Sequence, residues 1–211
     1  MGTKRSLARR LGAVRSFDAP RIDLEQYPTP SGIAANLVHF ADLRGDIQDH
    51  LVIDLGSGTG VLAIGCAFRN PERIVGLERD REAIEIARHN VQIVDPPRPI
   101  QWIWADVTVS PVRDSLNATV VMNPPFGAQR SNVHADRVFL EVAARVGRVS
   151  YSFHNEGSQQ FVEAFAADNG GRITDAAVTQ FDLEHQYEFH RKERTTFSVE
   201  LFRIEWENTD A

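Results

Sequence analysis

Short apolar runs alternate with amphipathic stretches of helix length through most of this chain. Such alternation is typical of an α/β fold with a doubly wound parallel sheet, because each helix returns the chain to the same edge of the sheet. The predicted strands are residues 51–54, 73–77, 100–104, 119–122 and 149–153. The predicted helices between them are residues 61–69, 81–90, 135–145 and 158–168, with Asp80 as the N-cap of the second.

The last apolar stretch, residues 195–206, differs from the others in its connection. The segment before it is too short for a helical crossover, so this strand should run antiparallel to its neighbour. At the other end of the chain, Leu7, Leu11 and Val14 follow helical spacing and predict an N-terminal helix that packs on the body. We expect residues 1–211 to form a single domain with one core.

Composition excludes several classes of protein. No apolar run approaches the roughly 20 residues that a membrane span needs, and residues 1–5 lack the apolar stretch of a secretion signal. Cys66 is the only cysteine, so an internal disulfide is impossible, and no His/Cys cluster has metal-ligand spacing. We therefore expect a cytoplasmic protein with no membrane contact and no metal.

A glycine turn follows the first predicted strand. Gly56, Gly58 and Gly60 lie between Asp54 and a predicted helix, where their backbone N–H groups can approach a ligand closely. The third glycine does not fit the G-x-G-x-x-G spacing of dinucleotide-binding folds, because Val61 stands at that position. The turn therefore predicts a cofactor site of another kind.

Acidic residues follow the next two predicted strands. Glu78 ends the second strand and is placed to accept hydrogen bonds from ribose hydroxyls. Asp106, followed by Val107, comes just after the third strand and is placed to accept from an adenine amine. Because the carboxyl ends of parallel strands meet at one edge, these residues and the glycine turn predict a nucleoside-containing cofactor.

The fourth predicted strand ends in Asn123-Pro124-Pro125-Phe126. Proline has no N–H, so the Asn123 side-chain oxygen and the Pro124 carbonyl can both accept from one planar NH₂ group. Phe126 supplies an aromatic face for the ring that carries this amine. We expect these four residues to form the catalytic turn.

Together these motifs resemble, in type and order, those of class I S-adenosylmethionine-dependent methyltransferases, which have a seven-stranded sheet. More closely, the chain resembles the methyltransferase-like five family and its archaeal relatives over nearly its whole length. The additional matching segments are Leu24-Glu25-Gln26-Tyr27-Pro28-Thr29-Pro30, Tyr151-Ser152-Phe153-His154 and Tyr187-Glu188-Phe189-His190-Arg191-Lys192. The resemblance implies N6-methylation of an unpaired adenosine in small-subunit ribosomal RNA, S-adenosylmethionine as cofactor, and a Trm112-like activator subunit.

The resemblance also implies roles for the N-terminal 30 residues as a helix and a segment that covers the site. Gln26 and Thr29 would contact the methionine end of the cofactor, and Tyr27 would line the base pocket or pack beneath it. Thr29 also suits a helix N-cap, with Pro30 at the first helical position.

Two further surfaces are candidates for partners. His190, Arg191 and Lys192 suit contacts with RNA phosphates. In the strand order that the resemblance implies, the third predicted strand, residues 100–104, would lie at the edge of the sheet. Its two tryptophans, Trp102 and Trp104, would either meet an added strand of the activator or be buried under helices. The histidines at 154, 185 and 190 are not needed as bases, because the mechanism requires none.

Three other functions remain open from the residues. A glutamine side-chain amide poses the same geometric problem, so N5-methylation of a release-factor protein is an alternative, although such enzymes usually carry Tyr where this chain has Phe126. DNA adenine-N6 methylation is another, with little chain left for a target-recognition domain. A non-catalytic binding module is the third.

Overall fold

The computed structural model describes residues 2–125, 135–183 and 195–207. In chain order, its helices and strands are α1 (Lys4–Leu11), η1 (Ile22–Leu24), α2 (Ser31–Leu43), β1 (Leu51–Leu55), α3 (Val61–Ala67), β2 (Arg73–Glu78), α4 (Arg81–Val94), β3 (Gln101–Trp104), η2 (Val107–Val109), β4 (Ala118–Met122), α5 (Ala135–Val146), β5 (Gly147–Asn155), α6 (Gln159–Asp168), β6 (Gly171–Leu183) and β7 (Thr195–Trp206).

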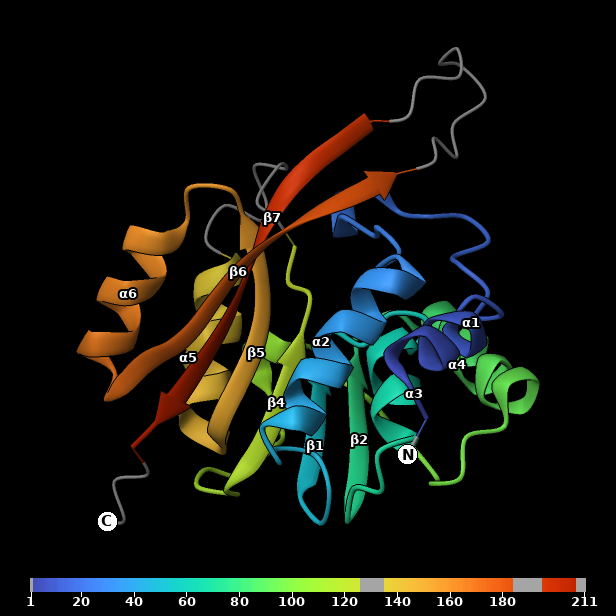
Figure 1. The fold of residues 1–211 in the computed structure, drawn as a ribbon, viewed down its shortest axis with the longest axis horizontal. Helices are drawn as coiled ribbons and strands as arrows, with labels where there is room; N and C mark the ends of the chain where they lie inside the picture. The colour runs from blue at the N-terminus through green and yellow to red at the C-terminus, as the bar shows by residue number, and fades with distance from the viewer. Residues whose placement is uncertain (1, 126–134, 184–194, 208–211) are drawn as a thin grey trace.

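The strands form one seven-stranded sheet in the order β3-β2-β1-β4-β5-β7-β6 (Figure 1). Strands β1 to β5 pair in parallel, and β7 runs antiparallel to both of its neighbours, β5 and β6. The predicted fold class and the antiparallel last strand are therefore confirmed. The strand order reverses between β1 and β4, and in such sheets ligands bind beyond the carboxyl ends of the strands at this point.

Helices cover both faces of the sheet, and each face has its own apolar core, so the expectation of one core was wrong. Alternate residues along each strand point to opposite faces. On β1, Val52 joins the core beneath α1, α2 and α3, whereas Ile53 joins the core beneath α5 and α6. Figure 1 shows the two groups of helices on opposite sides of the sheet. None of the described helices is long and apolar enough to cross a membrane.

The N-terminal helix packs as its spacing predicts. Leu7 and Leu11 of α1 are buried, and Val14 packs against the same core just beyond the end of the helix. The basic residues of α1 stay on its exposed face. The cysteine at 66 is buried in α3.

Two local predictions differ from the structure. No sequence pattern identified β6. In the part of the chain that the structure describes, β6 is an edge strand that pairs with β7 alone, and it carries exposed residues such as Val178. The prediction that Thr29 caps α2 was wrong. Helix α2 begins at Ser31, and its N-cap is Pro30, which has no side-chain hydrogen-bonding group. Thr29 lies one residue further out, and its hydroxyl meets Asn123 instead.

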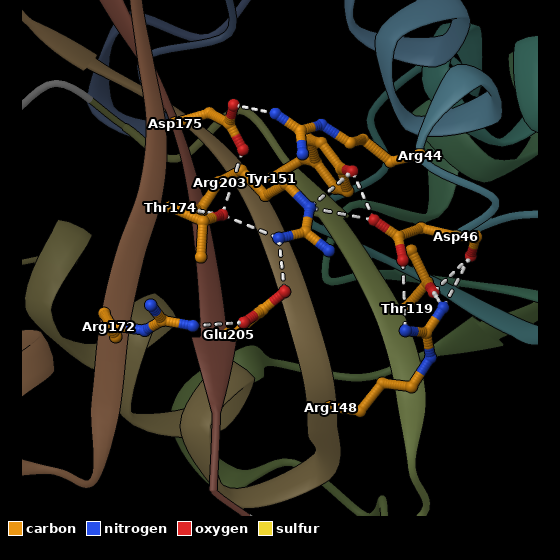
Figure 2. A network of polar contacts seen from close by, with 10 residues as sticks. All are labelled: Arg44, Asp46, Thr119, Arg148, Tyr151, Arg172, Thr174, Asp175, Arg203 and Glu205. Atoms are coloured by element: carbon orange, nitrogen blue, oxygen red, sulfur yellow. Dashed lines mark hydrogen bonds and ion pairs between the residues drawn. The ribbon is translucent and has the colours of Figure 1, made fainter.

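A buried polar network ties the connection after α2 to the strands β4, β5 and β7 (Figure 2). The Asp46 carboxylate lies at its centre. It accepts hydrogen bonds from Tyr151 Oη and Arg203 Nε, and it forms an ion pair with Arg148. The Asp46 backbone carbonyl accepts from the Thr119 hydroxyl. Asp46 and Arg203 are almost completely buried, so each charge depends on the other for compensation.

Candidate active site

The glycine turn lies between β1 and α3, and all three glycines adopt positive φ angles of 66°, 52° and 88° at Gly56, Gly58 and Gly60. Side chains surround the turn. A Cβ at Gly56 would lie 2.9 Å from the Phe139 ring, and one at Gly60 would lie 2.8 Å from the Trp102 ring. Both the backbone angles and the space therefore require glycine at these positions.

Glu78, at the end of β2, is connected to this turn. Its Oε2 accepts from the Gly58 N–H at 2.8 Å, and its Oε1 accepts from the Asp80 N–H at 2.9 Å. Glu78 is buried, and burial raises its pKa despite these hydrogen bonds. Each carboxylate oxygen retains a second lone pair, so Glu78 can still accept hydrogen bonds from a ligand.

Asp54, at the end of β1, is the second buried acid. Its Oδ2 accepts from the Ala63 N–H in the first turn of α3 at 2.9 Å, which anchors the glycine turn to the helix. Burial raises the pKa of Asp54 to about 7, and the nearby charge of Glu78 acts in the same direction.

Asp106 lies just after β3, in a more exposed position than Asp54 and Glu78. Its side chain caps η2 by accepting from the Thr108 N–H and hydroxyl. Partial burial by itself raises the pKa of Asp106, but these hydrogen bonds and the charge of Arg79 outweigh it, so the pKa is lowered. An ionised acceptor is therefore available at this end of the site.

A cavity of about 300 Å³ connects these strand ends. Most of the residues predicted for the site line it, namely Gln26, Tyr27, Thr29, Asp54, Gly56, Gly58, Glu78, Asp106, Val107, Asn123 and Pro125. Gly60 and Pro124 belong to the same two turns but do not line the cavity. Phe126, His190, Arg191 and Lys192 lie outside the described residues.

The segment between α1 and α2 forms one wall of the cavity. Gln26 anchors it, because its Nε2 donates to Asp80 Oδ2 at 2.6 Å and its Oε1 accepts from the Arg21 N–H at 2.8 Å. The Gln26 amide thus joins this segment to the start of α4. Its predicted contact with the methionine end of a cofactor stays a prediction.

Apolar walls of the cavity were not predicted. Phe17, before η1, lies over the glycine turn, where a Cβ at Gly58 would be 3.1 Å from its ring. Phe139 of α5 faces Gly56 in the same way. The helical pattern of residues 135–145 indicated a buried face for α5, but no local signal showed that Phe139 would reach the glycine turn.

The catalytic turn follows β4 and meets the wall segment. Asn123 Nδ2 donates to Thr29 Oγ1 at 3.0 Å, whereas Asn123 Oδ1 is buried without a hydrogen-bond partner among the described residues. A buried acceptor without a donor carries a free-energy cost. Asn123 lines the cavity, where the donor group of a ligand could supply the hydrogen bond that this oxygen lacks.

His154 does not belong to the site. It is buried on β5 beside Phe202, and its Nε2 lies 2.8 Å from Ser152 Oγ. Burial lowers its pKa to about 4, so the ring is neutral near pH 7. The other two histidines considered from the sequence, His185 and His190, lie outside the described residues.

Comparison with known proteins agrees with this geometry. The model of the methyltransferase small domain family matches residues 37–149. The rRNA N(6)-adenosine-methyltransferase Mettl5 of Drosophila melanogaster is 35% identical over 205 residues, with 95% of both chains covered. The corresponding protein of Danio rerio is 34% identical over 197 residues, which cover 92% of this chain and 94% of the relative.

A solved structure agrees as well. The crystal structure of a candidate RNA methyltransferase from Pyrococcus horikoshii superposes with a TM-score of 0.86 at 33% identity, covering 98% of each chain. The carboxylates, the glycine turn and the family matches lead to the same assignment. This chain belongs to the methyltransferase small domain family and, within it, to the Mettl5 family, and it is an S-adenosylmethionine-dependent methyltransferase.

Proposed function

We propose that this enzyme methylates N6 of an unpaired adenosine in ribosomal RNA, and that the RNA is that of the small subunit. The observation that carries the proposal is the buried, unpartnered Asn123 Oδ1 beside the cofactor cavity. An exocyclic amine supplies the donor that this oxygen lacks. The names of the Drosophila and zebrafish relatives support adenosine N6 as the acceptor.

The residues present fit S-adenosylmethionine. In our proposal Glu78 accepts from the ribose hydroxyls and Asp106 from the adenine amine, while the glycine turn allows close approach of the backbone. Thr29 and Gln26 line the cavity with them. When bound, the cofactor supplies an electrophilic methyl group on a sulfonium, so the protein needs no strong base to activate the amine.

The catalytic turn then acts through orientation. Asn123 Oδ1 and the Pro124 carbonyl accept from the NH₂ group, which draws the nitrogen toward tetrahedral geometry and directs its lone pair at the methyl carbon. The surplus proton leaves to water after transfer. In our proposal Phe126 stacks on the target base and Tyr27 lines the base pocket, which requires the adenosine to leave its helix.

We also propose a Trm112-like activator at the edge strand β3. Among the described strands β3 pairs only with β2, and its Trp104 is 61% exposed. Trp102 differs from it, because its ring packs over Gly60 and Gly76. The structure thus buries one tryptophan in part and leaves the other on an open strand edge, which suits addition of a partner strand.

The alternatives receive less support. Release factor glutamine methyltransferase of Burkholderia pseudomallei is 34% identical, but over only 93 residues that cover 42% of this chain. The Mettl5 relative of Drosophila, by contrast, matches over 95% of this chain. For DNA adenine methylation, the described residues outside the sheet and its helices offer no additional recognition domain.

The experiment is transfer of labelled methyl from S-adenosylmethionine to small-subunit RNA, large-subunit RNA and a release-factor protein, with and without a Trm112-type partner. Nucleoside analysis should find N6-methyladenosine in small-subunit RNA. Asn123→Ala should lower transfer by at least about 100-fold, since a transition-state hydrogen-bond acceptor is lost, while cofactor affinity measured by calorimetry stays nearly unchanged.

The other outcomes are distinct. Label confined to the release factor would move the function to glutamine methylation, with the fold and cofactor assignment standing. Label in large-subunit RNA alone would correct the choice of subunit. Full activity of Asn123→Ala would overturn the role of the catalytic turn.

A further inference from the structure

One contact joins the cofactor half of the site to the catalytic turn. Thr29 and Asn123 are 94 positions apart in the chain, yet Asn123 Nδ2 donates to Thr29 Oγ1 at 3.0 Å. Both residues line the cavity. Among the described residues, Thr29 forms no other side-chain hydrogen bond, and Asn123 Oδ1 has no partner.

A threonine hydroxyl does not by itself decide which way an asparagine amide faces. It can accept from Nδ2 or donate to Oδ1. In the first arrangement Oδ1 faces the cavity and can accept from an amine. In the second, Nδ2 faces the cavity, and it forms no hydrogen bond with the amine because both groups are donors. The productive arrangement therefore requires the Thr29 hydroxyl proton to have another acceptor.

The cofactor provides such an acceptor. S-adenosylmethionine has one anionic group, the carboxylate of its methionine part. Glu78 and Asp106, at the ends of β2 and β3, disfavour a carboxylate nearby, whereas Thr29 lies just before the first turn of α2, whose N–H groups favour an anion. The carboxylate is therefore best accommodated beside Thr29.

We infer that Thr29 is a positioning residue that couples the two halves of the site. Its hydroxyl donates to the cofactor carboxylate and accepts from Asn123 Nδ2, which leaves Asn123 Oδ1 facing the amine of the target base. Cofactor binding thus prepares the acceptor for the base. This inference rests on the proposed function, because it needs a target amine.

The test measures coupling between the two ligands rather than activity. The probe is an oligouridylate of single-stranded RNA with one central adenosine, and its binding is measured with saturating S-adenosylhomocysteine or 5′-methylthioadenosine. Only the first ligand carries the carboxylate. Wild-type protein should bind the probe at least about fivefold more tightly with S-adenosylhomocysteine, within the usual range of coupling between sites.

Thr29→Val keeps the shape of the side chain and removes the hydroxyl, so this variant should bind the probe equally well with either ligand. An unchanged affinity of the variant for 5′-methylthioadenosine would show that the cavity is intact. Thr29→Ser should retain the difference. A second probe with purine riboside in place of adenosine lacks the amine, so wild-type protein should show no difference with it.

The coupling would be overturned if the difference in probe affinity between the two ligands persists in Thr29→Val, or if it is absent in wild-type protein. A difference that is equal for the purine riboside probe would also overturn it, since the amine would then play no part. Methyl transfer from S-adenosylmethionine to the adenosine probe is assayed separately with wild-type protein. If methyl transfer occurs but S-adenosylhomocysteine does not tighten probe binding, the positioning role of Thr29 is refuted and the proposed function stands. If N6-methyladenosine forms in no RNA, the proposed function itself is refuted.

Discussion

Glu78 shows how burial sets the chemistry of one residue. Its two oxygens hold backbone N–H groups of the glycine turn and of the start of α4, so the side chain is fixed before any ligand arrives. Burial raises its pKa. The group that we assign to the ribose hydroxyls thus takes up a proton at higher pH than an ordinary glutamate, whose pKa is about 4.3.

We therefore predict that cofactor affinity falls as the pH is lowered through the raised pKa of Glu78. A protonated carboxyl has one oxygen occupied by its proton, so it accepts from two ribose hydroxyls less well. Calorimetric titration of S-adenosylhomocysteine across the acidic range measures this.

Glu78→Gln is the matched control for this prediction. It keeps the size of the side chain and cannot ionise, so affinity should be weaker at neutral pH, and the part of the pH dependence that belongs to Glu78 should disappear. An unchanged pH profile in Glu78→Gln would assign the dependence to another group, with Asp54 next in line because burial raises its pKa to about 7.

At the scale of elements, Asp46 fixes the connection after α2 against the strands. Its carboxylate meets Arg203 of β7 at 2.9 Å and Arg148 of β5 at 3.0 Å. Burial by itself raises the pKa of Asp46, but hydrogen bonds from Arg203 and Tyr151 and the charges of both arginines outweigh it and lower the pKa. The ionised form is the one that the folded protein holds.

Asp46→Ala should lower the free energy of unfolding by about 3–5 kcal/mol, because it leaves a buried arginine uncompensated. Denaturant titration measures the change. Because the folded-state pKa of Asp46 is lowered, its contribution is present above the pKa of the unfolded state and is lost as the pH falls through the folded-state pKa. Asp46→Asn should therefore show a shallower loss of stability in acid.

Glu205→Gln is the control for the network. Glu205 pairs with Arg203 and Arg172, but its side chain is 43% exposed, so its loss should cost about 0–1 kcal/mol. Equal effects of Asp46→Ala and Glu205→Gln would show that burial does not set the importance of these charges.

On the scale of the whole molecule, strands β6 and β7 extend beyond the carboxyl ends of the parallel strands, at the end of the sheet where the cofactor cavity lies (Figure 1). The basic residues His190, Arg191 and Lys192 stand in the sequence between these strands, outside the described residues. We propose, from the sequence alone, that they contact RNA phosphates. At the other end of the chain, Arg5 and Arg9 are exposed on α1.

Reversing the charge of Arg191 and Lys192 to Glu should weaken RNA binding and flatten its dependence on salt. Loss of two phosphate contacts on a single strand reduces the slope of log K against log salt by about 1.4. Filter binding of small-subunit RNA at several salt concentrations measures this slope. The control is the double variant Arg5→Glu and Arg9→Glu, which makes the same change of net charge on α1. An equal effect of both pairs would indicate a diffuse electrostatic attraction instead of a defined contact.

Much of this molecule followed from local sequence. The alternation of apolar runs and amphipathic stretches predicted the α/β sheet and most of its elements, because periodicity of 2 or 3.6 residues is a local property. The glycine turn, Glu78, Asp106 and Asn123 followed from their positions after strands. Parallel strands place their carboxyl ends at one edge, so the order of motifs was enough to bring these residues together.

The rest depended on contacts between distant parts of the chain. Thr29 suited a helix cap by local rules, yet the fold directs its hydroxyl to Asn123. Phe17 and Phe139 had no local signal that they would close over the glycine turn. Sequence alone thus determined the fold class and the meeting of the polar strand-end residues at one edge of the sheet, since both follow from periodicity and strand order. Only the tertiary structure decided how those side chains pair, because hydrogen-bond partners and burial depend on residues far apart in the chain.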